Sequence, residues 1–498
     1  MGPEASLLPL FAVSTPVVTA IAVVLCRRRP NIRDLALALG AIATFAIILM
    51  MLPRVLAGAV PTTTLGELVP GLTLQLRADG MGMVFAVLAG ALWTLASPYA
   101  IGYMRGAGET RQTRFYAFYA LCLATAFGVA FSGDLFTFFI FYELLTASTY
   151  PLVTHKGNAE AIQSGRKYLG FLLSGGVLVL LGLVILIAQT GDVTFVAGGF
   201  VGSTMSPTLT AMTFTLFAVG FATKAGVMPL HAWLPAAMVA PTPVSALLHA
   251  VAVVKAGVFA FGRLIGFVFG PEVLSGPLVT TLLTVLAATT ILVASVIALR
   301  QDALKRRLAY STIAHLAYMV LGFALLSRRA IDGALLHMVN HGVLKITLFF
   351  AAGAIYVHTK FDRVSQLDGI GRRMPWTMGA FAVASLGLAG LPPMGGFLSK
   401  WALVEGAIAS GDLVLAAVMV GAGLLTAAYL FPIVHRAYFR PPPSDSPELI
   451  RGRRDASPLM VAPLCITAGL GLLLGLGDLA GIHSLADSVA TAVTGGAR

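Results

Sequence analysis

The sequence predicts an all-α polytopic membrane protein of about 14 transmembrane helices, and three observations support this fold class. The 498 residues are 58% hydrophobic and 11% charged, whereas a soluble domain carries about 25% charged residues. Helix-length apolar runs recur to the end of the chain, and about 20 apolar residues suffice to cross a bilayer. Five ionisable side chains lie deep inside these runs, although hydrocarbon solvates charge poorly.

The expected helices follow the apolar runs in chain order. The first run has neither a basic leader nor a small-residue cleavage site, so we expect a retained helix rather than a signal peptide. The expected bounds are 7–26, 33–52, 81–104, 114–131, 134–154, 168–189, 208–234, 243–268, 277–299, 308–326, 331–356, 376–407, 413–434 and 457–476.

Two of these helices are expected to be broken. Helix 7 contains KAGVMPLHAWLP from Lys224, and helix 12 contains GLPPMGGFLSKW from Gly390. Proline removes a backbone donor and clashes with the preceding turn, so each helix should break at this point. Broken helices five spans apart are typical of inverted repeats. We therefore expect helices 1–3 in residues 1–110, inverted five-helix repeats in 111–270 and 271–436, and a cytoplasmic loop with helix 14 in 437–498.

The net charge of +12 indicates membrane topology rather than a nucleic-acid partner. If the N-terminus is outside, 23 of the 33 lysines and arginines fall in inside loops and six fall outside. Such an excess of basic residues marks the cytoplasmic face. The three cysteines are scattered and form no CxxC pair, so neither disulfides nor a metal site is expected.

The buried acid and the buried amines could move protons. Hydrocarbon favours the neutral form of Glu143 unless a cation is near, and we expect Lys224 to be that cation. Lys255, Lys345 and Lys400 complete the set, and a buried lysine can release a proton, as an arginine cannot. Alternatively, Lys400 has no role in proton transfer, lies near a span end and snorkels to the interface.

Histidines extend this polar set. His337, His341 and Lys345 follow at steps of four residues, which places them on one stripe of a helix. His249 precedes Lys255 by six residues, and His315 lies in the tenth span. Histidine can accept and donate a proton near neutral pH, so these groups could form a hydrated line along the membrane plane. Alternatively, each histidine only bonds one helix to another, and the glycine–proline breaks are simple packing kinks.

The same residues carry a resemblance to a known family. The stretch KAGVMPLHAWLPAAMVAPTPVSALLHAVAVVKAGV at 224–258 resembles the antiporter-like proton-translocating subunits of respiratory complex I, membrane-bound hydrogenases and Mrp-type multisubunit cation/proton antiporters. LAYSTIAHLAYM (308–319), HMVNHGVLKITLFFAAGAI (337–355) and GLPPMGGFLSKW (390–401) resemble the same subunits, and the resemblance covers about 80 to 435.

The resemblance implies a role for each polar residue. Glu143 is the expected fifth-helix acid, Lys224 its partner on broken helix 7, Lys255 the relay lysine of helix 8 and Lys400 the residue nearest the exit. The polar stripe of helix 11 matches His337, His341 and Lys345, and His249 and His315 fall at polar family positions. The family architecture is fourteen helices with two inverted five-helix repeats.

The resemblance also implies a function. We expect a proton-translocating subunit of a multisubunit complex in the bacterial inner membrane, with other antiporter-like and small membrane subunits as partners and with Na⁺ or K⁺ as the exchanged ion. Lysine at 400, where some complex I members have glutamate, favours the D-type subunit of a Mrp antiporter, whereas AAMVAPTPVSALLHA at 236–250 resembles the A- or L-type signature.

Three alternatives remain open at this point. The first is the equivalent proton-pumping subunit of a complex I-like NADH:quinone oxidoreductase or a membrane-bound hydrogenase, in which case the complex is an enzyme. The second is a scaffold with vestigial polar residues, and the third is a self-sufficient secondary transporter. The sequence shows no haem, flavin, nucleotide or iron–sulfur motif, so no cofactor is expected.

Overall fold

The protein is a bundle of membrane-spanning helices. A computed structural model describes residues 3–69, 71–202, 204–274, 277–442 and 454–495. Within these residues, eleven helical segments are long and apolar enough to cross a membrane. The other three predicted spans are not among these eleven. They correspond to α7 (Pro207–Ala225), to α13 (Leu304–Ala324), and to the pair α16 (Pro375–Ala389) and α17 (Gly395–Ala409). The prediction of an all-α polytopic fold is confirmed.

Most of the remaining helices correspond to predicted runs, but three of them, at Pro271–Leu274, Ile370–Arg373 and Ile482–Val493, lie outside every predicted run. They are α1 (Leu8–Leu25), α2 (Pro30–Leu56), α3 (Gly80–Gly106), α4 (Gln112–Phe131), α5 (Leu135–Val153), α6 (Ala159–Thr190), α8 (Trp233–Ala236), α9 (Thr242–Ala250), α10 (Val253–Arg263), α11 (Pro271–Leu274), α12 (Pro277–Arg300), α14 (Arg328–Thr359), α15 (Ile370–Arg373), α18 (Leu413–Phe439), α20 (Pro458–Leu476) and α21 (Ile482–Val493). Short 3₁₀ or π turns lie at Ala237–Val239, Leu264–Phe269, Val364–Gln366 and Leu479–Gly481.

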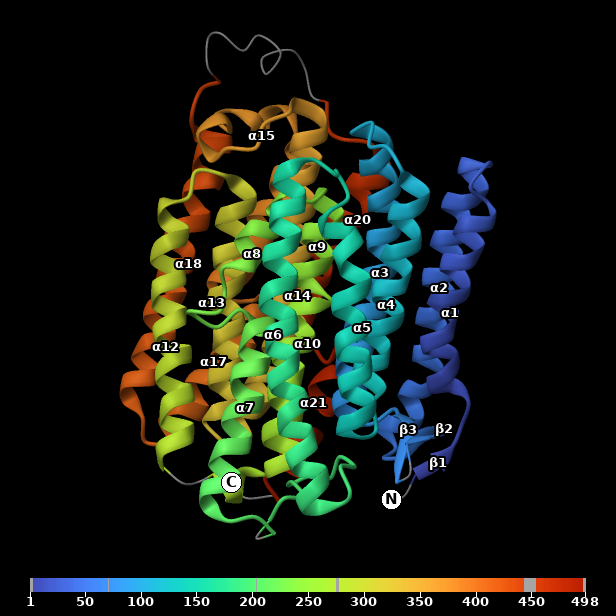
Figure 1. The fold of residues 1–498 in the computed structure, drawn as a ribbon. Coiled ribbons are helices and arrows are strands. Elements are labelled where there is room, and N and C mark those ends of the chain that lie inside the picture. Colours follow the sequence, from blue (N-terminus) through green and yellow to red (C-terminus); the bar gives the residue numbers. More distant parts are fainter. Residues whose placement is uncertain (1–2, 70, 203, 275–276, 443–453, 496–498) are drawn as a thin grey trace.

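The loops between the helices lie at two opposite ends of the bundle. One end, here called the basic face, carries α15 and the arginine- and lysine-rich loops, and it is the upper end in Figure 1. Contacts between distant loops hold it together, as where Lys305 donates to the carbonyl of Ala240 and Arg436 pairs with Asp368. The other end, the sheet face, carries β1–β3 (Figure 1). This separation places the predicted inside loops together on the basic face.

A small β-sheet forms the sheet face, and the sequence analysis did not predict it. Strand β1 (Pro3–Ala5) pairs in parallel with β2 (Val60–Val69), which pairs antiparallel with β3 (Leu72–Arg77). The amide of Gln75 donates to Thr137 Oγ on α5, so the sheet is bonded to the helical bundle. In residues 72–77, LTLQLR, leucine alternates with polar residues, a pattern that is typical of a strand.

Helices 7 and 12 are broken, as predicted. Helix α7 ends at Ala225, and Gly226 caps it in the left-handed conformation. Helix α16 likewise ends before a left-handed Gly390, and α17 resumes at Gly395. A further break, which was not predicted, separates α9 from α10 at residues 251–252. Lys255 therefore lies in the first turn of a new helix. The division of the chain into 1–110, 111–270, 271–436 and 437–498 stays a prediction.

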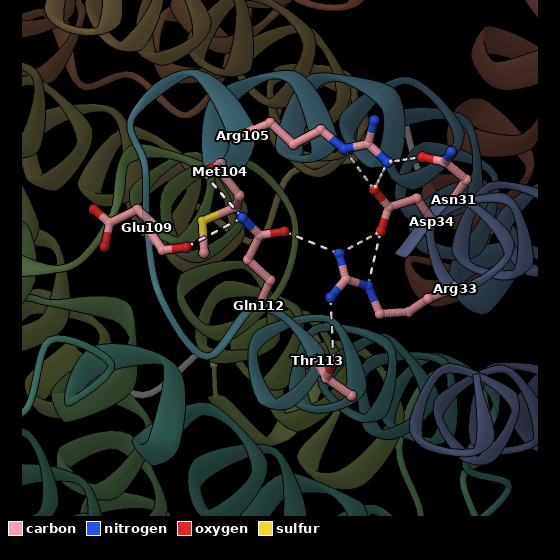
Figure 2. Close-up of polar contacts among 8 residues, drawn as sticks. All are labelled: Asn31, Arg33, Asp34, Met104, Arg105, Glu109, Gln112 and Thr113. Atoms are coloured by element: carbon pink, nitrogen blue, oxygen red, sulfur yellow. Dashed lines mark hydrogen bonds and ion pairs between the residues drawn. The ribbon is translucent and has the colours of Figure 1, made fainter. Parts of the chain in front are cut away.

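A network of charged side chains at the basic face ties α2 to α3 and α4 (Figure 2). Asp34, 4% exposed, accepts from Arg33 at 2.8 Å and from Arg105 at 2.5 Å. Arg33 also donates to Gln112 at 2.9 Å and to Thr113 at 3.2 Å. Since breaking a buried ion pair leaves an uncompensated charge, this network should stabilise the packing of α2 against α3 and α4.

We predict that Asp34→Ala lowers the free energy of unfolding by about 3 kcal/mol, because it leaves the buried guanidinium of Arg33 without its carboxylate. Unfolding of the purified protein in detergent measures this change. Glu4→Ala is the matched control, because Glu4 pairs with Arg54 through side chains that are 45% and 49% exposed. Its effect should stay below about 1 kcal/mol, and equal effects of both variants would contradict the structural role of the network.

Candidate functional site

Lys224 lies buried at the end of α7, close to the predicted acid on α5. Its Nζ donates to the carbonyl oxygen of Tyr142 at 2.5 Å and lies 3.3 Å from the centre of the Tyr142 ring. The neighbouring Glu143 packs its carboxylate against Gly176 on α6, where a Cβ would lie 2.6 Å from Oε1. Glu143 Oε1 is buried without a hydrogen-bond partner among the described residues. Lys224 and Glu143 are thus neighbours, with Tyr142 as the direct ligand of the amine.

No ion pair within 4.0 Å joins Glu143 to Lys224 in the described part of the chain. The expected direct acid–amine contact is therefore absent in this conformation. A small movement of either side chain changes their separation, and with it the attraction between the two charges. This geometry suits a pair whose coupling varies.

Lys255 meets the histidine stripe of α14. Its Nζ lies 2.8 Å from His341 Nδ1 and 3.8 Å from Met319 Sδ, and both Lys255 and His341 are fully buried. Helix α10 also packs closely on the end of α7, because a Cβ at Gly257 would lie 2.4 Å from the amide nitrogen of Ala225. The helices that carry Lys224 and Lys255 are therefore in direct contact.

Three histidines form the centre of the site. His315 on α13 places Nδ1 3.0 Å from His337 Nε2, and its ring centre lies 5.3 Å from that of His341. His337 continues to α17, where its Nδ1 lies 3.0 Å from Ser399 Oγ. All three histidines are at most 1% exposed. Hydrogen-bonded imidazoles can pass a proton from one ring nitrogen to the next.

Lys345 leads away from this centre toward the basic face. It lies one turn beyond His341 on α14, and its Nζ donates to Ser311 Oγ at 2.8 Å. Ser311 Oγ in turn lies 2.9 Å from the hydroxyl of Tyr429 on α18. The stripe runs along the axis of α14, so Lys345, His341 and His337 are arranged across the membrane rather than in its plane.

Lys400 is buried on α17 just after the break in helix 12. Its Nζ donates to the carbonyl of Leu388 at 2.7 Å and to that of Ala389 at 3.3 Å. These are carbonyls that the end of α16 leaves without intrahelical partners. The amine also lies 5.3 Å from the ring centre of Tyr318, which stacks near His315. Lys400 therefore borders the histidine cluster and does not snorkel to the interface.

His249 lies beneath a polar cavity at the basic face. The cavity has a volume of about 160 Å³ and is lined by Lys156, Lys305, Asp362 and Thr242, among others. Along α9 below Thr242, Ser245 Oγ and both ring nitrogens of His249 are buried without partners among the described residues. Buried polar groups of this kind are normally satisfied by water.

The structure thus brings most of the predicted residues together. Lys255, His341, His315 and His337 form one contact cluster, which Lys345 and Lys400 border. Lys224 with Glu143, and His249, lie apart from it without a direct bond. The sequence analysis missed Ser311, Ser399, Tyr429 and Tyr142. Ser311 precedes His315 by four residues, so helical spacing was the available signal for it.

The family of this chain follows from comparisons with known proteins. Residues 132–426 match the family described as NADH:quinone oxidoreductase/Mrp antiporter, transmembrane region. The N subunit of an NADH-quinone oxidoreductase from Desulforudis audaxviator is 35% identical over an alignment of 417 residues, which covers 80% of this chain and 82% of that protein. The D-type subunit of a Na⁺/H⁺ antiporter from Alkalihalophilus pseudofirmus is 29% identical over 368 residues, which are 74% of this chain and 73% of that protein.

The fold is also shared with a solved complex. A chain in the structure of the Mrp complex from Dietzia sp. DQ12-45-1b superposes with a TM-score of 0.86, at 23% identity, over 97% of this chain and 96% of that chain. The match in residues 132–426 covers more than half of the sequence, including Glu143, Lys224, Lys255, the histidines and Lys400. This chain is a multi-pass, antiporter-like membrane subunit that belongs to the NADH:quinone oxidoreductase/Mrp antiporter family.

Proposed function

We propose that this chain translocates protons as one subunit of a multisubunit Mrp-type Na⁺ or K⁺/H⁺ antiporter, in the position of the D-type subunit. The observation that carries the proposal is a contact cluster across four helices. Lys255 and His341, His315 and His337, and His337 and Ser399 lie within hydrogen-bonding distance, and the ring centres of His341 and His315 lie 5.3 Å apart. Stability alone does not favour several buried ionisable groups in one place. A role in binding and releasing a proton in turn would account for these buried ionisable groups.

The mechanism we propose is electrostatic. A change of charge at Glu143 alters the proton affinity of Lys224, because charge interactions act strongly in a medium of low dielectric. A proton on Lys224 then repels one on Lys255, which can pass its proton to His341 at 2.8 Å. From there the imidazoles of His315 and His337 carry it toward Ser399, while Lys345 and Lys400 modulate the cluster through their charge. No covalent bond other than those to the proton changes.

The access route we propose begins at the basic face, which we place in the cytoplasm of a bacterial cell with the N-terminus outside. The cavity at Lys305 and Thr242 opens there, and the unpartnered Ser245 and His249 continue it along α9. Water between these groups would connect the cytoplasm to the centre of the membrane.

His249→Phe should therefore slow proton uptake by about tenfold, whereas His435→Phe, at an exposed histidine on α18, should not. Proton uptake by reconstituted vesicles measures both, and equal rates would contradict this route.

A second candidate function is the same proton module inside a redox-driven complex. The 35% identity to the N subunit of an NADH-quinone oxidoreductase favours it, as does the A- or L-type character of residues 236–250. Purification of the native complex separates the two. Co-purified iron–sulfur subunits would establish the redox-driven complex, and cation-dependent proton exchange without an electron donor would establish the antiporter.

The proposed role is tested at Glu143 and Lys224. We predict that Glu143→Gln and Lys224→Met each reduce proton transport by the reconstituted complex by at least about tenfold, because each removes one charge of the coupled pair. Transport is followed with a pH-sensitive dye in proteoliposomes. Assembly is checked in parallel by native gel electrophoresis. Full transport by both correctly assembled variants would support the scaffold alternative instead.

A further inference from the structure

An apolar groove opens between α16 and α20 on the side of the bundle. It has a volume of about 570 Å³ and is lined by Trp376, Gly379 and Val383 from α16 and by Cys465, Gly469 and Leu472 from α20. A volume of this size lies within the range of about 300–1,000 Å³ that is typical of small-molecule sites. Trp376 is 67% exposed and Leu472 is 36% exposed. Helix α20 is long enough to span the bilayer and α16 is the first half of the broken helix 12, so the groove faces lipid.

Small residues form the floor of the groove and leave it unfilled by protein. A Cβ placed on Gly469 would have no atom of another residue within 4 Å, and one on Gly379 would meet only the Tyr438 hydroxyl at 3.8 Å. Glycines that pack helices closely show much shorter distances, such as 2.6 Å between a Cβ at Gly406 and Ala330. The groove is therefore open space along the helices, which a hydrocarbon chain could occupy.

The upper mouth of the groove is strongly basic. Helix α15, just before α16, carries Arg372 and Arg373, and the amide of Arg454 donates to the carbonyl of Arg373 at 3.0 Å. Arg372 and Arg454 are exposed. In the described part of the chain no carboxylate lies within 4.0 Å of either guanidinium. Figure 1 places α15 at the upper end of the bundle, on the basic face.

Asp455, the acidic residue that follows Arg454, already has hydrogen-bond partners. Asp455 accepts hydrogen bonds from the amides of Trp376 and Thr377 at 2.9 and 3.2 Å, and it also accepts from the Thr377 hydroxyl. Its charge therefore caps the N-terminus of α16. The cationic groups at the mouth outnumber it, so the mouth favours an anion beside Arg372 and Arg454.

We propose that this groove binds one anionic phospholipid from the leaflet at the basic face. One acyl chain lies between α16 and α20 over Gly379 and Gly469, and the phosphate contacts Arg372 and Arg454. Basic pockets between transmembrane helices bind anionic headgroups, and tryptophan favours the interface at which Trp376 stands. The lipid would support α16, whose terminal carbonyls hold Lys400. The proposal concerns binding and does not depend on the proposed proton transport.

Native mass spectrometry of the purified chain, titrated with phosphatidylglycerol or phosphatidylcholine, tests the proposal. The wild type should retain one phosphatidylglycerol in preference to phosphatidylcholine. The double variant Arg372→Gln/Arg454→Gln should lose about thirtyfold in affinity for phosphatidylglycerol, since each of the two arginines near a charged headgroup contributes about 1 kcal/mol. Its affinity for phosphatidylcholine should not change. Arg27→Gln/Arg28→Gln, at exposed arginines after α1, is the matched control and should behave as wild type.

A second pair of variants tests the groove itself. Gly379→Leu/Gly469→Leu adds apolar side chains at two positions where a Cβ meets no protein atom closer than 3.8 Å, so the chain should fold and should lose retention of the lipid. Gly170→Leu on α6, another exposed glycine with nothing within 4 Å of its Cβ, should retain it. Equal binding of both lipids, or undiminished binding by the filled groove, would overturn the proposal. So would cross-linking of Cys465 to a neighbouring subunit in the intact complex, because a partner helix would then occupy the groove.

Discussion

Replacing Lys255 with methionine is expected to abolish proton transport without lowering stability. Proton transfer by a positioned side chain contributes about 10²–10⁴-fold to a rate, so we expect transport to fall at least about a hundredfold. The free energy of unfolding should not fall, because a buried charge is costly and an apolar side chain of similar size is well tolerated at such a site. Dye-monitored transport in proteoliposomes and unfolding in detergent measure the two effects.

Lys255→Arg distinguishes a mobile proton from a fixed charge. A guanidinium keeps the positive charge beside His341 but does not release a proton, so this variant should also be inactive. Met319→Leu is the matched control, since Met319 contacts the same amine only through its sulfur at 3.8 Å, and it should transport protons at nearly the wild-type rate. Full transport by Lys255→Arg would show that Lys255 acts only through its charge.

The broken helices show what sequence can predict about this fold. The breaks after Ala225 and Ala389 follow from glycine and proline, whose backbone effects are local. The break between α9 and α10 has neither residue at 251–252. This break therefore has no glycine or proline signal in the sequence. Strands β2 and β3 were also missed, although the alternation of leucine with polar residues in LTLQLR of β3 is a strand signal.

The candidate site, too, could be predicted only in part from the sequence. Hydrophobic context alone identified the buried lysines and Glu143, because charge at membrane depth stands out against its neighbours. Helical spacing identified the stripe on α14. The contacts between helices could not be predicted, since they depend on which faces meet. Tyr142 displaces Glu143 as the direct ligand of Lys224, and no spacing rule distinguishes these two adjacent residues in advance.

His337→Phe is expected to reduce transport by about a hundredfold. His337 contacts both His315 and Ser399 at 3.0 Å, so it joins α13 to α17. Phenylalanine has a similar shape but neither accepts nor donates a proton. Ser399→Ala should slow transport only a few-fold, because a water molecule can replace a hydroxyl in a hydrogen-bonded chain. Both variants are measured in the same proteoliposome assay, with His358→Phe, a histidine at the basic-face end of α14, as the control.

The double variant then shows whether the proton path ends at Ser399. If His337 and Ser399 act in series, His337→Phe/Ser399→Ala should be no slower than His337→Phe alone, because residues that act as one unit are not additive. A rate that falls by the product of the two effects would place them on separate paths. Normal transport by His337→Phe combined with inactivity of Lys345→Met would redirect the path through Ser311 and Tyr429. The lower half of the histidine stripe would then be structural.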